Sequence, residues 1–266
     1  MITVQKDNLQ YLVSPLLEGT PHCFSTRFGG VSEGYLSSLN LGTHRGDDPA
    51  NVRENYRILG KAVGFDPLHT VFTKQIHSDI VERVGRSHCG RGLLREATEG
   101  CDGLVTDETG VVLTVFSADC TPVLFFDPVA NAIGAAHAGW RGTASGIVAQ
   151  VVEKMTAEFG SDPKNIRVAI GPCISQCCFE THRDVPDAMI ASLGEEANTH
   201  ILPKGEKYLV DLKGLNALWL QKAGVEQIHI AKECTACEPD RFWSHRRVGD
   251  QRGSLAAMIT LGGEQP

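Results

Sequence analysis

The sequence predicts an α+β fold, in which residues 1–266 form a single domain of mixed β-sheets flanked by helices. Strand-like and helical segments mix along the chain without the strict alternation that a doubly wound parallel sheet requires. No composition break, low-complexity tract or internal repeat marks a domain boundary. The chain is also long enough to bury a substantial core, and its 42% hydrophobic and 21% charged residues are ordinary for a globular protein.

One helix is well marked in the first half of the chain. Asp48 is a preferred N-cap residue, Pro49 suits the first helical position, and Gly64 provides a stop, so the helix is expected to end at Val63. The segments around it are expected to be a strand entering a glycine turn (24–32), a strand (71–84) and a charged surface loop (86–100).

Three apolar runs follow one another closely in the middle of the chain, at 111–116, 122–126 and 132–136. Such short spacing favours strands that are neighbours in one sheet. From Thr143 the apolar residues recur at helical spacing until Gly160. The remaining elements are expected to be strands at 166–170, 228–230 and 255–261 and helices at 184–193 and 212–223.

Charge and cysteine usage exclude several classes of protein. The net charge of −7 argues against a general nucleic-acid binder, whose surface would be basic. The first residues lack the basic and apolar regions of a secretory signal, and no run approaches the roughly 20 apolar residues of a membrane span. Nine cysteines, an odd number, fit a reducing compartment better than a disulfide framework. We therefore expect a cytoplasmic protein with neither a nucleic-acid nor a membrane partner.

Three residues carry the metal hypothesis: His77, Cys120 and His137. Two imidazoles and one thiolate suit zinc, and three protein ligands leave the fourth position open, as catalytic zinc requires. Each residue taken singly is more often structural. However, Cys120 lies at a turn without an evident packing role, and His137 ends a strand just before a glycine, where backbone can approach a ligand closely. Their spacings of 43 and 17 residues match no compact zinc finger. The sequence therefore predicts one shared site.

Seven short blocks run nearly from one end of the chain to the other: 26–32, 75–77, 101–107, 118–124, 136–142, 171–174 and 244–247. They resemble the signature blocks of the YfiH-like, laccase-domain family, once described as multicopper polyphenol oxidases and later as purine nucleoside phosphorylases. The resemblance implies zinc, or copper, at His77, Cys120 and His137. It also implies phosphorolysis of adenosine, inosine and methylthioadenosine, with adenosine deamination. The expected partners are a purine nucleoside and phosphate, and the expected assembly is a monomer or weak homodimer.

The chain departs from the family pattern at two places. His245 and Val248 stand where members often show Tyr and Asp, and Ser78 stands where Gly is frequent after the metal histidine. Neither departure changes an expected metal ligand.

The expected chemistry needs residues beyond the metal ligands. Zinc lowers the pKa of bound water toward about 7, which suits attack on a purine C6. Asp119 is placed to move the proton or to orient a ligand, and capping the turn is an equally good account of it. Phosphate could bind the metal, or arginines for which a surface ion pair is the alternative role. The arginine candidates are Arg141 at a helix start, Arg27, Arg45 and Arg246.

Several other hypotheses compete with a metal-dependent purine nucleoside phosphorylase. None of the ten histidines is two residues from another, which disfavours a multicopper oxidase, and the cytidine-deaminase pattern is absent. A cysteine hydrolase with Cys120 as nucleophile and His137 as base would suit editing of peptidoglycan precursors, and a non-catalytic binding module is disfavoured by the open metal position. The pair Cys234 and Cys237 could form a separate structural zinc site with Cys173 and either Cys177 or Cys178, or these could be buried or partnerless thiols.

Overall fold

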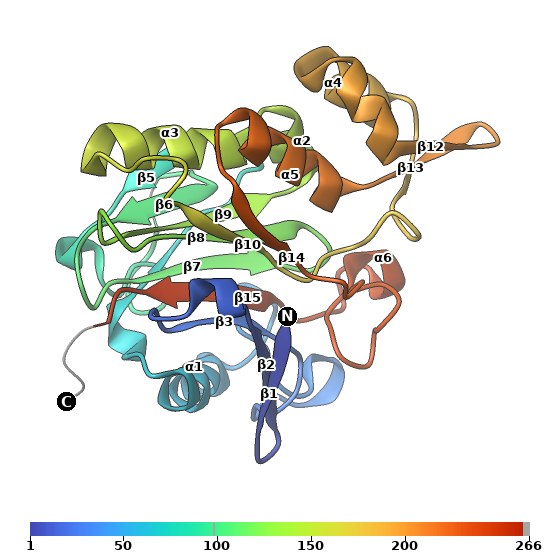
Figure 1. The fold of residues 1–266 in the computed structure, drawn as a ribbon. Helices are drawn as coiled ribbons and strands as arrows, with labels where there is room; N and C mark the ends of the chain where they lie inside the picture. The colour runs from blue at the N-terminus through green and yellow to red at the C-terminus, as the bar shows by residue number, and fades with distance from the viewer. Residues whose placement is uncertain (98, 263–266) are drawn as a thin grey trace.

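Two stacked six-stranded sheets form the centre of the computed structural model, which describes residues 1–97 and 99–262 (Figure 1). The first sheet has the order β1 (Ile2–Lys6), β2 (Leu9–Val13), β3 (His22–Ser25), β15 (Leu255–Thr260), β7 (Val112–Ser117), β4 (Thr70–Phe72). The second has the order β14 (Gln227–Ile230), β10 (Arg167–Ile170), β8 (Thr121–Asp127), β9 (Ala132–Ala138), β6 (Gly103–Thr106), β5 (Val81–Arg83). A small third sheet consists of β11 (Glu180–Thr181), β13 (Lys207–Val210) and β12 (Ile201–Lys204).

Helices cover the outer faces of the two large sheets (Figure 1). Helix α1 (Pro49–Val63) packs on the first sheet, while α3 (Ile147–Phe159) and α5 (Leu212–Lys222) pack on the second. The short helix α2 (Trp140–Ala144) follows β9, and the short helix α6 (His245–Val248) precedes β15. Helix α4 (Asp184–Leu193) lies beside the third sheet. Short 3₁₀ helices occupy Pro15–Leu17, Gly34–Leu36, Pro67–His69, Arg86–His88 and Glu195–His200. No helix in the described ranges is long and apolar enough to cross a membrane.

The two-residue period of the strands divides the core into layers. In β15, Ala257 and Ile259 belong to the layer between the large sheets, whereas Met258 belongs to the layer against α1. In β8, Leu124 faces the layer between the sheets and Phe125 faces the layer against α3 and α5. Helices, parallel pairs and antiparallel pairs thus combine in one architecture, which confirms the predicted α+β class with mixed sheets.

The sequence signals for α1 are confirmed in detail. The Asp48 carboxylate accepts a hydrogen bond from the Ala50 amide at 2.8 Å. At the other end Gly64 adopts φ 97°, which a residue with a side chain rarely adopts, and its amide bonds to the Gly60 carbonyl. Val52, Tyr56 and Leu59 share one face of the helix and are buried against the first sheet.

Two strand predictions were wrong, and both errors fall where the chain crosses between the large sheets. Residues 71–84 form β4 in the first sheet and β5 in the second, with an irregular crossing over 73–80. The runs 111–116 and 122–126 also belong to different sheets. Apolar content marks a buried strand but does not say which of two stacked sheets it enters.

Candidate metal centre

The two crossings and the end of β9 bring three donors together. The ligand-type atoms of His77, Cys120 and His137 all lie within 4.8 Å of one another. Because Zn–N and Zn–S bonds measure about 2.0–2.3 Å, donors of one tetrahedral zinc lie about 3.3–3.8 Å apart, which falls within this limit. The two imidazole rings stand edge to face, with centroids 4.9 Å apart. The predicted convergence of these residues therefore exists in the fold.

Strand geometry explains how His137 reaches the site. It follows Ile133 and Ala135 at two-residue intervals in β9, so its side chain points into the layer between the sheets. The chain enters β8 directly after Cys120, and the left-handed φ of 91° at Asp119 reverses it there. His77 lies in the first crossing and also has a left-handed φ, of 62°.

A buried carboxylate, Asp102, holds two of the three donors. Its Oδ1 accepts hydrogen bonds from His137 Nδ1 at 2.8 Å and from the His77 amide at 3.1 Å. Its Oδ2 accepts from the amides of Ile76 and Ser78 and from the Ser78 hydroxyl. The bond at Nδ1 leaves His137 Nε2 as the nitrogen available to an ion.

Sequence reasoning missed the role of Asp102. The signal was present, because an aspartate interrupts an otherwise apolar segment immediately before β6. A carboxylate at such a position is buried, and a buried carboxylate needs several donors.

The site favours a thiolate at Cys120. Burial alone would raise the pKa of this thiol, but the charge and hydrogen bonds of His137, followed by those of His77, outweigh burial and lower the pKa to about 6. Burial also opposes charging of His137, yet Cys120 and Asp102 raise its pKa to about 9. Burial likewise opposes ionisation of Asp102, but hydrogen bonds from His137 and Ser78 lower its pKa to about 2. The site thus stabilises negative charge on the thiol and carboxylate beside the imidazoles.

Gly139 leaves room for this donor set. A Cβ at this position would lie 2.8 Å from His77 Cδ2 and 3.3 Å from Cys120 Sγ. The φ of −66° is open to any residue, so the constraint is the space between the donors and not the backbone conformation.

Replacing Gly139 with alanine is therefore expected to push His77 and Cys120 apart. We expect Gly139→Ala to lower stability by about 1–3 kcal/mol, as overpacking usually does, and to reduce metal retention. Thermal unfolding and metal content after dialysis against a chelator measure both effects. Gly262→Ala is the matched control, because, apart from Gly262 and its chain neighbours, no atom of residues 1–97 or 99–262 lies within 4 Å of a Cβ placed there. Equal metal retention in the two variants would contradict this account of Gly139.

A cavity of about 340 Å³ opens beside the three donors. His77 and Cys120 line it on one side, and Asp119, Arg246 and Arg252 add charged groups. Its remaining lining is largely apolar, with Ala118, Trp140, Ile174, Phe179 and Leu212, together with His245. The cavity therefore combines ligand-type donors, cations and an apolar wall.

Asp119 joins two other segments to this cavity. Its Oδ1 accepts a hydrogen bond from the Thr235 hydroxyl at 2.6 Å, and its Oδ2 accepts one from the Arg246 amide at 2.6 Å. The Arg246 guanidinium in turn donates to the main-chain carbonyls of Cys178 and Glu180. Asp119 therefore fixes the wall that α6 contributes.

Arg252, which sequence reasoning missed, is a buried cation in the cavity lining. The residue is 9% exposed, and among the described residues its Nε has no hydrogen-bond partner. Burial and, secondarily, the charge of Arg45 lower its pKa to about 10, so it stays charged at neutral pH. Its position three residues before β15 carries no motif that marks it in the sequence.

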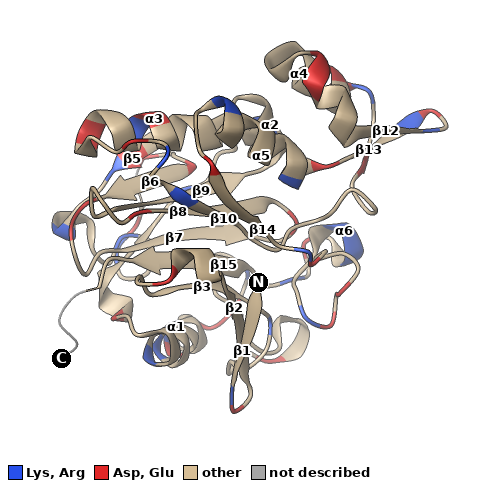
Figure 2. Cartoon of the chain, viewed as in Figure 1, with Lys and Arg blue, Asp and Glu red and all other residues tan. Residues whose placement is uncertain are grey.

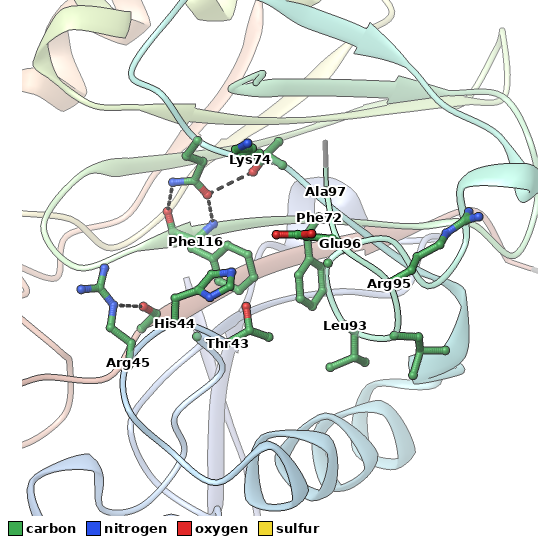
Figure 3. Close-up of a pocket in the computed structure, with 16 residues that line it drawn as sticks. Thr43, His44, Arg45, Phe72, Lys74, Leu93, Arg95, Glu96, Ala97 and Phe116 are labelled. Carbon is green, nitrogen blue, oxygen red and sulfur yellow. Dashed lines mark hydrogen bonds between the residues drawn. The ribbon is translucent and has the colours of Figure 1, made fainter. Parts of the chain in front are cut away.

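The other predicted arginines lie elsewhere. Arg45 lines a second cavity of about 540 Å³, where its Nε donates to Ser254 Oγ (Figure 3). Arg27 stacks on Trp243 and donates to main-chain carbonyls. Arg141 is exposed and stacks on Trp140. Of the four predicted arginines, the cavity beside His77 includes Arg246.

Comparison with known proteins agrees with this architecture. The family model described as multi-copper polyphenol oxidoreductase laccase matches residues 21–262. Purine nucleoside phosphorylase YlmD of Geobacillus stearothermophilus is 39% identical over 254 residues, covering 92% of this chain and 92% of its own. Purine nucleoside phosphorylase YfiH of Escherichia coli is 36% identical, covering 93% and 96%.

Solved structures agree as well. The crystal structure of YlmD from Geobacillus stearothermophilus superposes with a TM-score of 0.92 at 37% identity, covering 97% of this chain and 98% of that one. The crystal structure of Bacillus licheniformis YfiH gives 0.91 at 33% identity. With a family match over most of its length and the same fold, this chain belongs to the YfiH-like, laccase-domain family.

Proposed function

We propose that this protein is a zinc-dependent purine nucleoside phosphorylase that accepts adenosine, inosine and methylthioadenosine and also deaminates adenosine. The names of its relatives support phosphorolysis. The observation that carries the proposal is one cavity in which His77 and Cys120, two members of the His₂Cys donor set, share the lining with two arginines and an apolar wall. Copper is the alternative metal at the same ligands.

The donor set fits a metal that keeps an exchangeable position. His77, Cys120 and His137 would hold the ion, and Asp102 would fix the tautomer of His137. Bound zinc would supply Lewis acidity and lower the pKa of a water ligand toward about 7.

Phosphate binding is assigned to the cations of the cavity. Arg252 offers a buried guanidinium whose Nε has no hydrogen-bond partner within the described part of the chain, and a charge-assisted hydrogen bond to phosphate would satisfy it. Arg246 adds a second positive charge at the same cavity, although main-chain carbonyls already accept from its guanidinium.

The remaining lining suits a purine nucleoside. Phe179 and Trp140 offer aromatic surface to the base, and Ile174 with Leu212 excludes water from it. Each carboxylate oxygen of Asp119 accepts one hydrogen bond and keeps a second lone pair for a substrate hydroxyl or a transferred proton.

Incubation with adenosine, with and without phosphate, tests the proposal. Adenine formed only in the presence of phosphate supports phosphorolysis, and inosine in either incubation supports deamination. We expect His77→Ala and Cys120→Ala to abolish both products, because each removes one of three donors. His69→Ala is a matched control, since His69 lies in a 3₁₀ turn outside both cavity linings. Metal-containing protein that yields neither product would refute the proposed activity.

A second candidate is an amidohydrolase that edits peptidoglycan precursors. Its support is the Cys120–His137 contact, which lowers the thiol pKa to about 6 and resembles an activated nucleophile with its base. Amide hydrolysis by metal-free protein, lost in Cys120→Ser, would favour this candidate over the phosphorylase.

We further propose that the enzyme works in the cytoplasm on a nucleoside and phosphate, as a monomer or weak homodimer, without nucleic-acid or membrane partners. Gel filtration with light scattering tests the assembly.

A further inference from the structure

A second cluster of potential metal donors lies outside the donor set of His77, Cys120 and His137. The thiol sulfurs of Cys177, Cys178, Cys234 and Cys237 all lie within 4.8 Å of one another. They come from two loops that are far apart in the sequence. The first loop follows β10 and leads to β11, and the second follows β14 and leads to α6.

The sulfur spacing is that of a tetrahedral thiolate site. The Sγ of Cys177 lies 3.7 Å from that of Cys178, 3.9 Å from that of Cys234 and 3.6 Å from that of Cys237. Cys178 and Cys237 are 3.4 Å apart. Four thiolates around one zinc with Zn–S bonds of about 2.3 Å would form a tetrahedron with edges of about 3.8 Å. Disulfides would instead bring the sulfurs in pairs to about 2.05 Å.

The backbone around Cys234 is arranged to support a thiolate. The Ser175 amide from the first loop donates to Cys234 Sγ at 3.3 Å. Within the second loop the Cys237 amide donates to the Cys234 carbonyl at 3.1 Å, which closes the turn of a Cys-x-x-Cys pair. Such a turn presents both sulfurs on one side, as zinc-binding loops with this spacing do.

Cations are attached to both loops, which would offset the charge of a tetrathiolate. The Arg246 guanidinium donates to the Cys178 carbonyl at 3.0 Å, and Arg247 donates to the Ala236 carbonyl. Both belong to α6, the basic helix beside these loops (Figure 2). Lys213 donates to Ser175 Oγ and to the carbonyls of Ala231 and Glu233.

The sequence predicted Cys173 and either Cys177 or Cys178 as partners of Cys234 and Cys237, but the structure replaces Cys173 by the second of the adjacent cysteines. Cys173 is buried, and its thiol donates to the Ile174 carbonyl, whereas the adjacent residues Cys177 and Cys178 both join the cluster.

We propose that Cys177, Cys178, Cys234 and Cys237 bind a second, structural zinc ion as a tetrathiolate. Binding releases the thiol protons and adds no other group, so the four positions are filled by protein. The ion fastens the two loops to each other. Through the two loops the ion positions Phe179 and Arg246 in the cavity lining. It also positions Thr235, which donates a hydrogen bond to Asp119.

Metal content of purified variants tests the proposal independently of enzymatic activity. We expect two zinc ions per wild-type chain, one in His77→Ala, one in Cys237→Ser, and none when both substitutions are combined. Cys89→Ser is the matched control, because Cys89 is also partly exposed and belongs to neither donor group. It should retain two ions. A His77→Ala protein without metal would overturn the proposal, as would iron in place of zinc.

Wild-type protein provides a test that does not depend on the variants folding. In zinc-loaded protein, alkylation should spare Cys177 and Cys237 although both are exposed, and chelator treatment should make them reactive. Unfolding without a reductant should then leave all nine cysteines alkylated, the four of this cluster among them, because no disulfide has formed. Disulfide-linked peptides containing these cysteines, or reactivity unchanged by the chelator, would overturn the proposal.

A spectroscopic readout distinguishes the two sites. Cobalt loaded into the His77→Ala protein should give the intense absorption of a tetrahedral thiolate complex. Adding Cys237→Ser to His77→Ala should remove this absorption. We also expect loss of the second ion to raise the KM for nucleoside more than it changes kcat, since the ion positions the wall and does not touch the substrate. A change confined to kcat would contradict the positioning role.

Discussion

Asp102→Asn is expected to cost the protein most of its metal affinity at His77, Cys120 and His137. A carboxamide has one acceptor oxygen, and its nitrogen is a donor. That nitrogen would face amide, hydroxyl or imidazole groups that now donate hydrogen bonds to the carboxylate. Losing such a partner of a metal-bound histidine usually weakens binding about 10- to 100-fold. Leaving buried donors unpaired should also lower stability by about 1–3 kcal/mol.

Chelator competition measures the affinity, and thermal unfolding with and without zinc measures the stability. Asp107→Asn is the control, because Asp107 is exposed and pairs with Arg83 at the surface. Equal zinc affinity in the Asp102 and Asp107 variants would remove Asp102 from the site.

The same carboxylate predicts a pH dependence of folding. The pKa of Asp102 falls to about 2 in the folded protein, below its value of about 3.9 in an unfolded chain. Its contribution to stability is therefore fully present above pH 4 and is lost as the pH falls toward 2. Urea unfolding should show the difference between wild type and Asp102→Asn narrowing over that interval. A constant difference would contradict the assigned ionisation.

Arg252 should dominate phosphate binding. Removing a hydrogen bond to a charged group costs about 1.5–3 kcal/mol, so we expect Arg252→Met to raise the KM for phosphate about 10- to 150-fold. Arg252→Lys should recover only part of the loss, because an ammonium group cannot reproduce the planar fork. Arg183→Gln, which alters an exposed ion pair with Asp187, is the control.

Initial rates over a phosphate series at saturating nucleoside measure this effect. A phosphate KM in Arg252→Met that matches the control would assign phosphate to another group. The same series applied to Arg45, Arg141 and Arg246 variants would then identify that group.

Local signals in the sequence predicted the helices well. Asp48, Pro49 and Gly64 delimit α1 because capping and left-handed termination depend on neighbouring residues. Gly160 ends α3 for the same reason. The hairpin β1–β2 and the small third sheet were missed, since strands of two to five residues are too short for an alternating pattern to stand out.

The site was predictable to a smaller degree. Ligand chemistry and the family blocks identified His77, Cys120 and His137, and the fold brings them together. Asp102 and Arg252 escaped because their importance comes from burial beside partners that are distant in the sequence. Arg141 had a plausible local context at a helix start, but local context does not decide which side chain enters a cavity.

The two crossings between the large sheets have a consequence for assembly. His77 lies in the connection from β4 to β5, and Cys120 lies in the connection from β7 to β8. Both connections lead from the first large sheet to the second. The donors can meet only when both sheets have docked, and an ion that binds them selects the docked state over the separated one. Metal uptake would then report the closing of the interface between the two sheets, and metal release would accompany its opening.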